Sequence, residues 1–400
     1  DIKRIIPFIT VEPVVKKDMP SPGKILRYGR NSLFLRTQFL LQEQKGFTDE
    51  PDPDKQYQGN KLKYYTRYQF DYKRRVKFGF VAEKDAGEAF FRGDQKYGFD
   101  YYSAHLQVND IWKFKTLTLG DYHVRFGQGL VAWSGISTGK SAYVMNVKKK
   151  YDGLRKYSST DENKFMRGVG MTGKFGKFEI TGFTSFKYID GNLDTTDNIF
   201  EPEEIVTSFQ TTGLHRNQSE LIDRKSVSEF IYGGNITWNH PKLKIGASYI
   251  EYFFGQELQR DERDYNQYAF SGDHGMNASI DYETRIKNIY IFGEEAVSMN
   301  GGFALLNSAS MKLAPQMSLA LLQRYYSKDY QAYYSGAFGE QSNAQNENGI
   351  YMGTEIHPVR NWKLSAYFDV YKFTWLRYAA YSPSSGNEFF SVLEYSHNRN

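Results

Sequence analysis

Two short glycine-rich stretches are the parts of this sequence that most resemble sites for chemistry. Residues 168–173, GVGMTG, match the fingerprint that cradles a dinucleotide. That fingerprint needs a helix and an acidic residue after it, whereas this copy opens a strand and has neither. Residues 135–141, GISTGKS, resemble a phosphate-binding loop with one residue too few between its glycines. We therefore expect no nucleotide and no other cofactor.

Groups that could catalyse a reaction or hold a metal are scattered. The seven histidines show no HExxH motif or metal-ligand spacing, and we interpret them as solvated polar side chains. Glu294 and Glu295 are adjacent, so in a strand they point to opposite faces and cannot act as a pair. The absence of cysteine excludes disulfides and thiolate sites. With no activated nucleophile to name, we predict that the chain is not an enzyme and expect no metal site.

Charged side chains that alternate with apolar ones are more informative. In residues 61–73, KLKYYTRYQFDYK, one row is mostly apolar and aromatic and the other is mostly charged, which predicts a strand with two unlike faces. The pattern recurs along the chain, and we expect the charged rows to face a hydrated lumen. The candidates are Lys63, Arg67, Asp71, Lys242, Lys244, Asp281, Glu283, Arg285 and Asp369. Their mixed signs predict either pairs that stiffen a narrow lumen or a passage without strong ion selectivity.

The elements that must position these rows are strands of membrane-spanning length. The chain has 32 Tyr and 30 Phe, yet its mean hydropathy is −0.63. No apolar run approaches the roughly 20 residues of a membrane helix. A membrane barrel reconciles these facts, because half of each strand faces water and aromatic girdles mark its interfaces. The alternative is a water-soluble all-β protein rich in tyrosine.

About sixteen segments of roughly 9–13 residues, joined alternately by long and short links, suit tilted membrane strands. They predict an all-β, transmembrane, antiparallel up-and-down barrel with short periplasmic turns, long extracellular loops and a periplasmic N-terminus. Residues 1–22 would be a periplasmic lead-in and residues 23–400 the barrel, with its first strand starting near Lys24. The polar end SHNRN leaves the strand count and the closure of the barrel open.

Residues 125–164 are the longest irregular stretch, and they mix glycine, apolar and basic residues. An external loop gains nothing from apolar residues unless they pack. We predict that this segment folds into the barrel mouth as a plug or constriction, or docks on a partner. The alternative is that the preceding strand continues through it. The residues expected to matter are Arg125, Gly127, Gly129, Leu130, Trp133 and Lys140.

Residues 119–141, LGDYHVRFGQGLVAWSGISTGKS, resemble a family of outer-membrane β-barrel proteins from Bacteroidota that carry helix-hairpin-helix repeats before the barrel. The opening DIKRIIPFITVEP is similar to the end of that helical region. The resemblance implies a Gram-negative outer-membrane location and a periplasmic domain that is not in this sequence. Helix-hairpin-helix repeats elsewhere bind the DNA backbone, so the resemblance also suggests DNA uptake, although the residues that would bind DNA are not present.

Two functions from different classes fit these observations. The first is a pore or translocation channel with a loop constriction. The second is a non-conducting structural or accessory subunit of an outer-membrane assembly or export complex. Expected partners are outer-membrane lipid and other envelope proteins. The net charge of +5 is mild, so nucleic acid is not an expected partner of this portion. The cargo and the oligomeric state are open.

Overall fold

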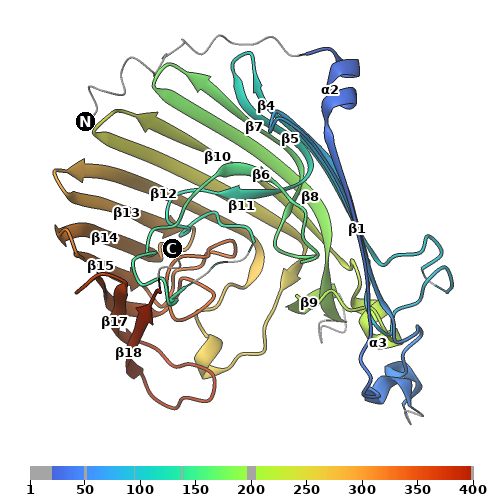
Figure 1. The fold of residues 1–400 in the computed structure, drawn as a ribbon. Coiled ribbons are helices and arrows are strands. Elements are labelled where there is room, and N and C mark those ends of the chain that lie inside the picture. Colours follow the sequence, from blue (N-terminus) through green and yellow to red (C-terminus); the bar gives the residue numbers. More distant parts are fainter. Residues whose placement is uncertain are drawn as a thin grey trace.

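One antiparallel sheet of eighteen strands forms nearly the whole of the computed structural model, which describes residues 20–48, 52–93, 95–135, 137, 139–195 and 204–397. The sheet curves around a central space into which several loops fold (Figure 1). Its strands are β1 (Arg30–Gln38), β2 (Lys63–Tyr72), β3 (Val76–Lys84), β4 (Tyr101–Ile111), β5 (Phe114–Arg125), β6 (Gly153–Lys156), β7 (Met166–Phe175), β8 (Phe178–Thr195), β9 (Glu204–Gln210), β10 (Val227–Asn239), β11 (Leu243–Leu258), β12 (Gly272–Ile286), β13 (Ile289–Ser298), β14 (Phe303–Ala314), β15 (Met317–Tyr326), β16 (Glu347–Ile356), β17 (Trp362–Phe373) and β18 (Ser384–Tyr395).

Each long strand pairs with the next long strand along the chain. The short strands β6 and β9 lie within loops, so β5 pairs with β7 and β8 pairs with β10. The remaining sixteen strands alternate in direction, as in an up-and-down barrel. The predicted fold class, a large all-β antiparallel architecture of the transmembrane-barrel type with about sixteen main strands, is therefore confirmed.

The links fall on two opposite rims. Tight turns such as residues 73–75, 176–177 and 287–288 lie on one rim, which we call the short-turn rim. Most of the long links lie on the other, the long-loop rim (Figure 1). The long-loop rim carries the short helices η2 (Lys45–Phe47), η3 (Pro53–Lys55), α3 (Gln218–Asp223) and η4 (Asp264–Asn266). One link on the long-loop rim, residues 299–302, has only four residues.

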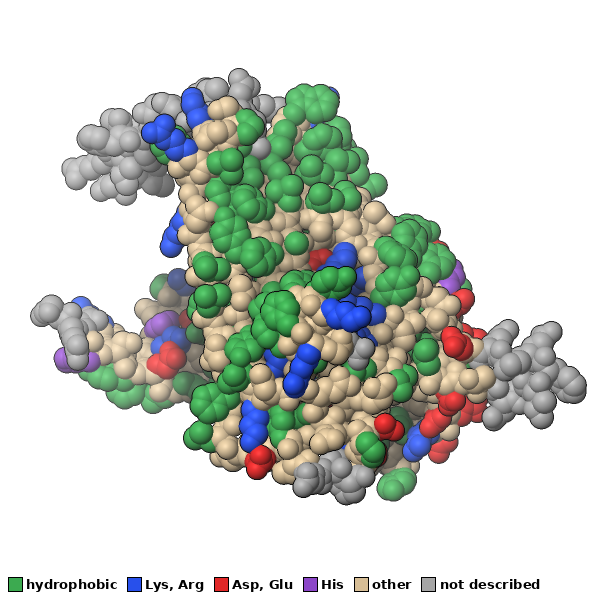
Figure 2. Space-filling view, turned by 90° about the vertical axis from the view of Figure 1, so that its right-hand side faces the viewer, with side chains coloured by type: hydrophobic (Ala, Val, Ile, Leu, Met, Phe, Trp, Pro, Cys, Tyr) green, Lys and Arg blue, Asp and Glu red, His purple; other side chains and the backbone are tan. Residues whose placement is uncertain are grey.

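Burial alternates along the strands and separates two faces. In β4, Tyr101, Ser103 and His105 are buried on the inner side, whereas Tyr102 and Leu106 are exposed on the outer side. On the face shown in Figure 2, hydrophobic side chains gather in the upper part, and most of the acidic ones lie in the lower half. The period of two in the sequence thus produces an apolar outer surface and a polar inner surface.

The first strand begins later than expected. Residues near Lys24 form a helix, α2 (Pro22–Tyr28), and β1 starts only at Arg30. Pro22 occupies the start of this helix, where its missing N–H costs nothing and its fixed φ favours the helical turn. Most of the predicted lead-in, residues 1–19, lies outside the described residues.

The two ends of the sheet do not meet. Within the described ranges, β1 pairs only with β2 and β18 only with β17. All nine residues of β1 are exposed, and the two strands lie on different sides of the central space (Figure 1). Each therefore presents an edge of unpaired backbone groups.

No helix among the described residues is both long enough and apolar enough to cross a bilayer.

Candidate functional site: a plug of two loops in the bore

The chain turns into the bore directly after β5. Gly127 and Gly129 adopt left-handed φ values of 55° and 85°, which a side chain would disfavour. The turn closes with a hydrogen bond of 3.0 Å from the Phe126 N–H to the Ala132 carbonyl. Arg125, at the end of β5, forms an isolated bridge with Trp133. These contacts double residues 126–134 back onto the strand end, so β5 does not continue through the segment.

The tip of this turn is apolar and packs on the inner wall. Leu130 and Val131 are fully buried, and Trp133 is 8% exposed. Leu130 and Val131 belong to one hydrophobic cluster with wall residues that include Phe292 of β13 and Leu322 of β15. Full burial of a side chain such as leucine stabilises by roughly 1.5–3 kcal/mol. Burial of these side chains therefore stabilises the docked position of the turn.

A second loop, residues 327–346, locks onto the first. The Trp133 N–H donates to the Tyr334 carbonyl at 2.8 Å, and the Gly336 N–H donates to the Gly129 carbonyl at 2.8 Å. The buried Tyr330 hydroxyl also donates to the Leu130 carbonyl, at 2.9 Å. We call the described residues of 126–152 and 327–346 together the plug. Only the first of these loops was predicted from the sequence to enter the barrel.

Glu294 of β13 anchors the plug to the wall. Its carboxylate is fully buried and accepts hydrogen bonds from the N–H groups of Gln128 (2.6 Å) and Leu130 (3.0 Å) and from the Ser279 hydroxyl (2.7 Å). Three donors around one carboxylate make a strong, directional clamp. The neighbouring Glu295 is exposed on the outer face of the same strand. An inward-facing acid within a strand was the available sequence signal, but Glu294 was considered only as half of a catalytic pair.

A second anchor lies two strands along the same wall, where Leu306 of β14 pairs with both Glu294 of β13 and Arg324 of β15. Arg324 of β15 is fully buried and donates to both carboxylate oxygens of Asp369 at 2.9 and 3.0 Å, and it also bonds Glu347. Lys140 from the first loop reaches Asp369 at 3.1 Å and pairs with Glu340 of the second loop. One ionic network thus joins both loops to β15, β16 and β17.

Several of the predicted lumen charges take part in pairs rather than lining open water. Lys63 lies 2.9 Å from Glu83 and also bonds Asp85. Lys244 lies 3.5 Å from Glu283, which also accepts from Lys148 of the first loop at 2.7 Å. Salt bridges therefore connect the wall to the plug.

The remaining predicted lumen charges divide between bore and rim. Asp281 is buried on the inner face of β12, and Asp71 accepts a backbone hydrogen bond from Arg74 at the adjoining turn. Arg67 lies 5.6 Å from the Phe34 ring. Lys242 was placed wrongly, because it is exposed in the turn before β11 rather than within the strand. Arg285 is exposed close to the same short-turn rim, near the end of β12.

Two histidines contradict the expectation of solvated side chains: His105, buried on the inner face of β4, and His215. His215, in the loop after β9, is 3% exposed, and its Nδ1 and Nε2 bond Asp100 at 2.5 Å and Asp190 at 2.9 Å. Burial alone would lower the pKa of His215. The hydrogen bonds and charges of the two aspartates outweigh burial and raise the pKa from 6.5 to about 10. The ligand atoms of Glu88, Asp100 and His215 lie within 4.8 Å of one another, a spacing that could hold a metal ion. Because both ring nitrogens already bond carboxylates, we interpret the cluster as an ionic lock between loops.

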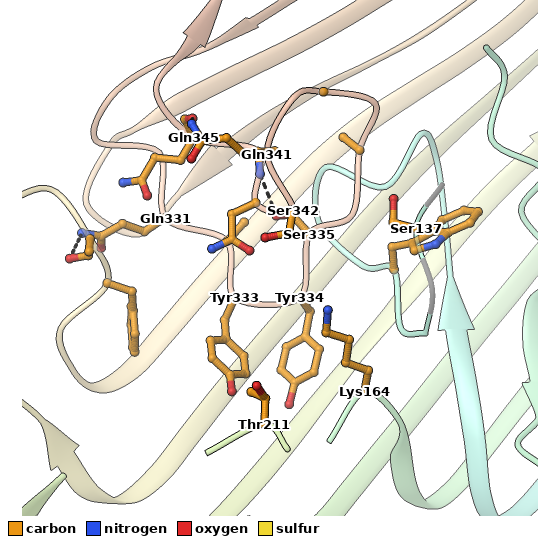
Figure 3. Close-up of a pocket in the computed structure, with 18 of the residues that line it drawn as sticks. Ser137, Lys164, Thr211, Gln331, Tyr333, Tyr334, Ser335, Gln341, Ser342 and Gln345 are labelled. Carbon is orange, nitrogen blue, oxygen red and sulfur yellow. Dashed lines mark hydrogen bonds between the residues drawn. The ribbon is translucent and has the colours of Figure 1, made fainter. Parts of the chain in front are cut away.

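The plug borders a cavity of about 440 Å³ (Figure 3). Tyr333, Tyr334, Ser335 and Gln341 from the second loop lie on one side of it, and Lys164 lies beside Tyr334. The segments around residues 209 and 260–270 complete its lining.

Comparisons with known proteins find similar structures but no similar sequences. No family model matches the chain, and no curated protein matches its sequence. OccK11 (OpdR) of Pseudomonas aeruginosa is 9% identical with a TM-score of 0.44, covering 92% of this chain and 84% of its own. An anion-selective porin from Comamonas acidovorans is 12% identical with a TM-score of 0.38, covering 86% and 89%. The outer-membrane protein OmpT of Vibrio cholerae is 8% identical with a TM-score of 0.34, covering 95% and 100%. None of these likenesses bears on function.

Replacing Glu294 with glutamine should loosen the plug and leave the barrel folded. The substitution replaces a charged acceptor, and hydrogen bonds to charged groups contribute about 1.5–3 kcal/mol. We expect the hydrogen-exchange protection of the Gln128 and Leu130 amides to fall about tenfold or more, as measured by mass spectrometry on detergent-solubilised protein. The matched control is Glu295→Gln on the opposite face, and equal protection in the two variants would contradict the anchor.

Raising the pH should release the His215 lock. Because the folded pKa of His215 is raised from 6.5 to about 10, its stabilising contribution is fully present below about pH 6.5 and is lost as the pH rises through 10. We expect protection factors of residues 211–217 to fall between pH 7 and pH 10.5. In His215→Gln they should be lower and should not change over that range. A pH-independent wild-type loop would show that His215 carries no charge there.

Proposed function

We propose that this protein is an outer-membrane β-barrel that serves as a gated translocation channel, closed at rest by the plug. The observation that carries the proposal is the interlock of the two loops inside the bore, made by backbone hydrogen bonds between Trp133 and Tyr334 and between Gly336 and Gly129. Loops that served only as external caps would not need these inward contacts.

The outer surface supports the membrane location. Exposed side chains on the outward rows of neighbouring strands are apolar, as with Ile245 in β11, Ile280 in β12 and Phe368 in β17. Buried inward positions are often polar, including Ser248 and Asn277. Lipid outside and water inside require this division. We infer that the short-turn rim faces the periplasm, because outer-membrane barrels keep their short turns there.

Opening would require the plug to leave two anchors. Glu294 would lose its backbone donors, and the salt bridge of Lys140 to Asp369 would break. The exposed wall would then present Glu294 and Asp369 together with Arg324, a mixture of signs that predicts weak ion selectivity. The closed state is therefore favoured until a ligand or partner binds the released plug more tightly than the docked one.

A second candidate function, a non-conducting accessory subunit of an envelope complex, is favoured by one feature of the outer wall. Glu295, Asn307 and Gln323 point outward from β13, β14 and β15. Glu295 and Gln323 are exposed, and a carboxylate facing hydrocarbon is costly. A neighbouring protein on this part of the wall would remove that cost. The relationship to helix-hairpin-helix barrel proteins, and with it a role in DNA uptake, stays a proposal that rests on residues 119–141.

Removing part of the plug should open a conducting path. We expect wild-type protein in planar bilayers to be mostly silent, and a variant in which a short Gly-Ser bridge replaces residues 137–148 to give discrete, long-lived conductance steps. Glu294→Gln should give brief openings more often than wild type does, because it weakens one anchor only.

The control is a deletion of residues 378–381, in an exposed part of the long-loop rim where Tyr378 is 79% and Tyr381 100% exposed. This variant should behave as wild type. A folded plug-deletion barrel that stays silent would favour the accessory subunit, whereas a wild-type barrel that conducts as well as the deletion variant would show that the plug does not close the bore.

Labelling of single introduced cysteines should report the orientation of the barrel in the membrane. The chain contains no cysteine, so the wild-type protein gives no background labelling. Tyr381→Cys, on the long-loop rim, should react with a membrane-impermeant maleimide on intact cells. Val359→Cys, in a short turn and 63% exposed, should react only after the outer membrane is permeabilised. The reverse pattern would invert the proposed topology.

A further inference from the structure

The cavity beside the plug has the size and chemistry of a ligand site. Its volume of about 440 Å³ lies within the range of small-molecule pockets. Segments from five places in the chain line it, including both loops of the plug, so a bound molecule could touch both loops (Figure 3). Such convergence of distant loops around a concave space is typical of binding sites.

The charge of the lining is one-sided. No described residue that lines the cavity is an aspartate or a glutamate, whereas Lys164 and Arg260 both line it. Neither cation forms a salt bridge among the described residues, although Arg260 Nε donates to the Phe270 carbonyl at 3.2 Å. Asn163, next to Lys164, has a buried amide Nδ2 without a hydrogen-bond partner in the described chain. These groups are donors, so they favour a ligand rich in acceptors and negatively charged.

The rest of the lining suits a hydroxylated molecule. Amides and hydroxyls can each donate and accept, which matches sugar hydroxyls, and aromatic rings offer apolar surface for the C–H face of a sugar ring. The polar members include Ser137, Thr211, Gln331, Ser335, Gln341 and Gln345. The aromatic members are Trp133, Phe209, Phe270, Tyr330, Tyr333 and Tyr334.

We propose that this cavity binds a monosaccharide-sized sugar acid, with its carboxylate beside Lys164 and Arg260 and its ring against the aromatic side chains. The absence of acidic groups among the described lining residues disfavours amines and metal cations, which need negative partners. The proposal does not depend on whether the plug gates a channel, because it concerns binding alone.

Isothermal titration of the full chain in detergent tests the proposal with three probes of similar size: glucuronate, glucose and glucosamine. For a ligand with so few atoms we expect a glucuronate Kd on the order of 1 mM. Glucose should bind about tenfold more weakly or less, and glucosamine should show no binding. Equal affinity for glucose and glucuronate would overturn the anionic part of the proposal, and no binding of glucuronate at about ten times the expected Kd would overturn it entirely.

Charge variants locate the site. Lys164→Gln and Arg260→Gln should each weaken glucuronate binding about fivefold or more and leave the weaker binding of glucose unchanged. The matched control is Lys174→Gln, at an exposed lysine near the end of β7 on the short-turn rim, which should bind as wild type does. Unchanged binding in both cavity variants would place the glucuronate elsewhere and refute this site. Neither experiment measures conductance. A plug-deletion barrel that stays silent in planar bilayers would therefore count against the channel without affecting this binding site.

Discussion

A buried carboxylate in a protein interior must be satisfied by donors, and the organisation of this bore follows from how Glu294 meets that requirement. The wall supplies one donor, from Ser279, and the turn after β5 supplies two backbone N–H groups. The wall is therefore incomplete without the loop, because an uncompensated charge on the inner face would be costly. The loop is equally incomplete without the wall, since its own N–H groups would be orphaned. Each needs the other to be stable.

The same mutual dependence explains why two loops occupy the bore. The first loop brings an apolar tip, and the second covers it with Tyr330 and Tyr334. The Tyr330 hydroxyl donates to the Leu130 carbonyl, and the Tyr334 hydroxyl donates to Glu229. Buried tyrosines suit this setting because the ring is apolar while the hydroxyl can satisfy a distant polar group. A plug built in this way is rigid when docked, and its release exposes several unsatisfied groups at once.

The repeating architecture could be predicted from the sequence, but much of the plug could not. Strands such as β2 and β17 alternate because one face meets water and the other does not, so periodicity alone located them. The apolar residues Leu130 and Trp133 in an irregular segment pointed to packing. The second loop, rich in Gly, Ser, Asn and Gln, has the composition of an exposed loop, and only contacts distant in sequence hold it inside. His215 and Arg324 were missed for the same reason, because their aspartate partners lie far away in the chain.

The directions of the two unpaired edge strands limit how many further strands could complete a closed barrel. Arg30, at the start of β1, pairs near the short-turn rim, and Tyr395, at the end of β18, returns to that rim. The two margins therefore run in opposite directions. Backbone groups facing lipid must be hydrogen-bonded, so the ring must close in a membrane. Direct contact between the margins, or an even number of intervening strands, keeps every neighbour antiparallel, whereas an odd number would force one parallel pair into the ring.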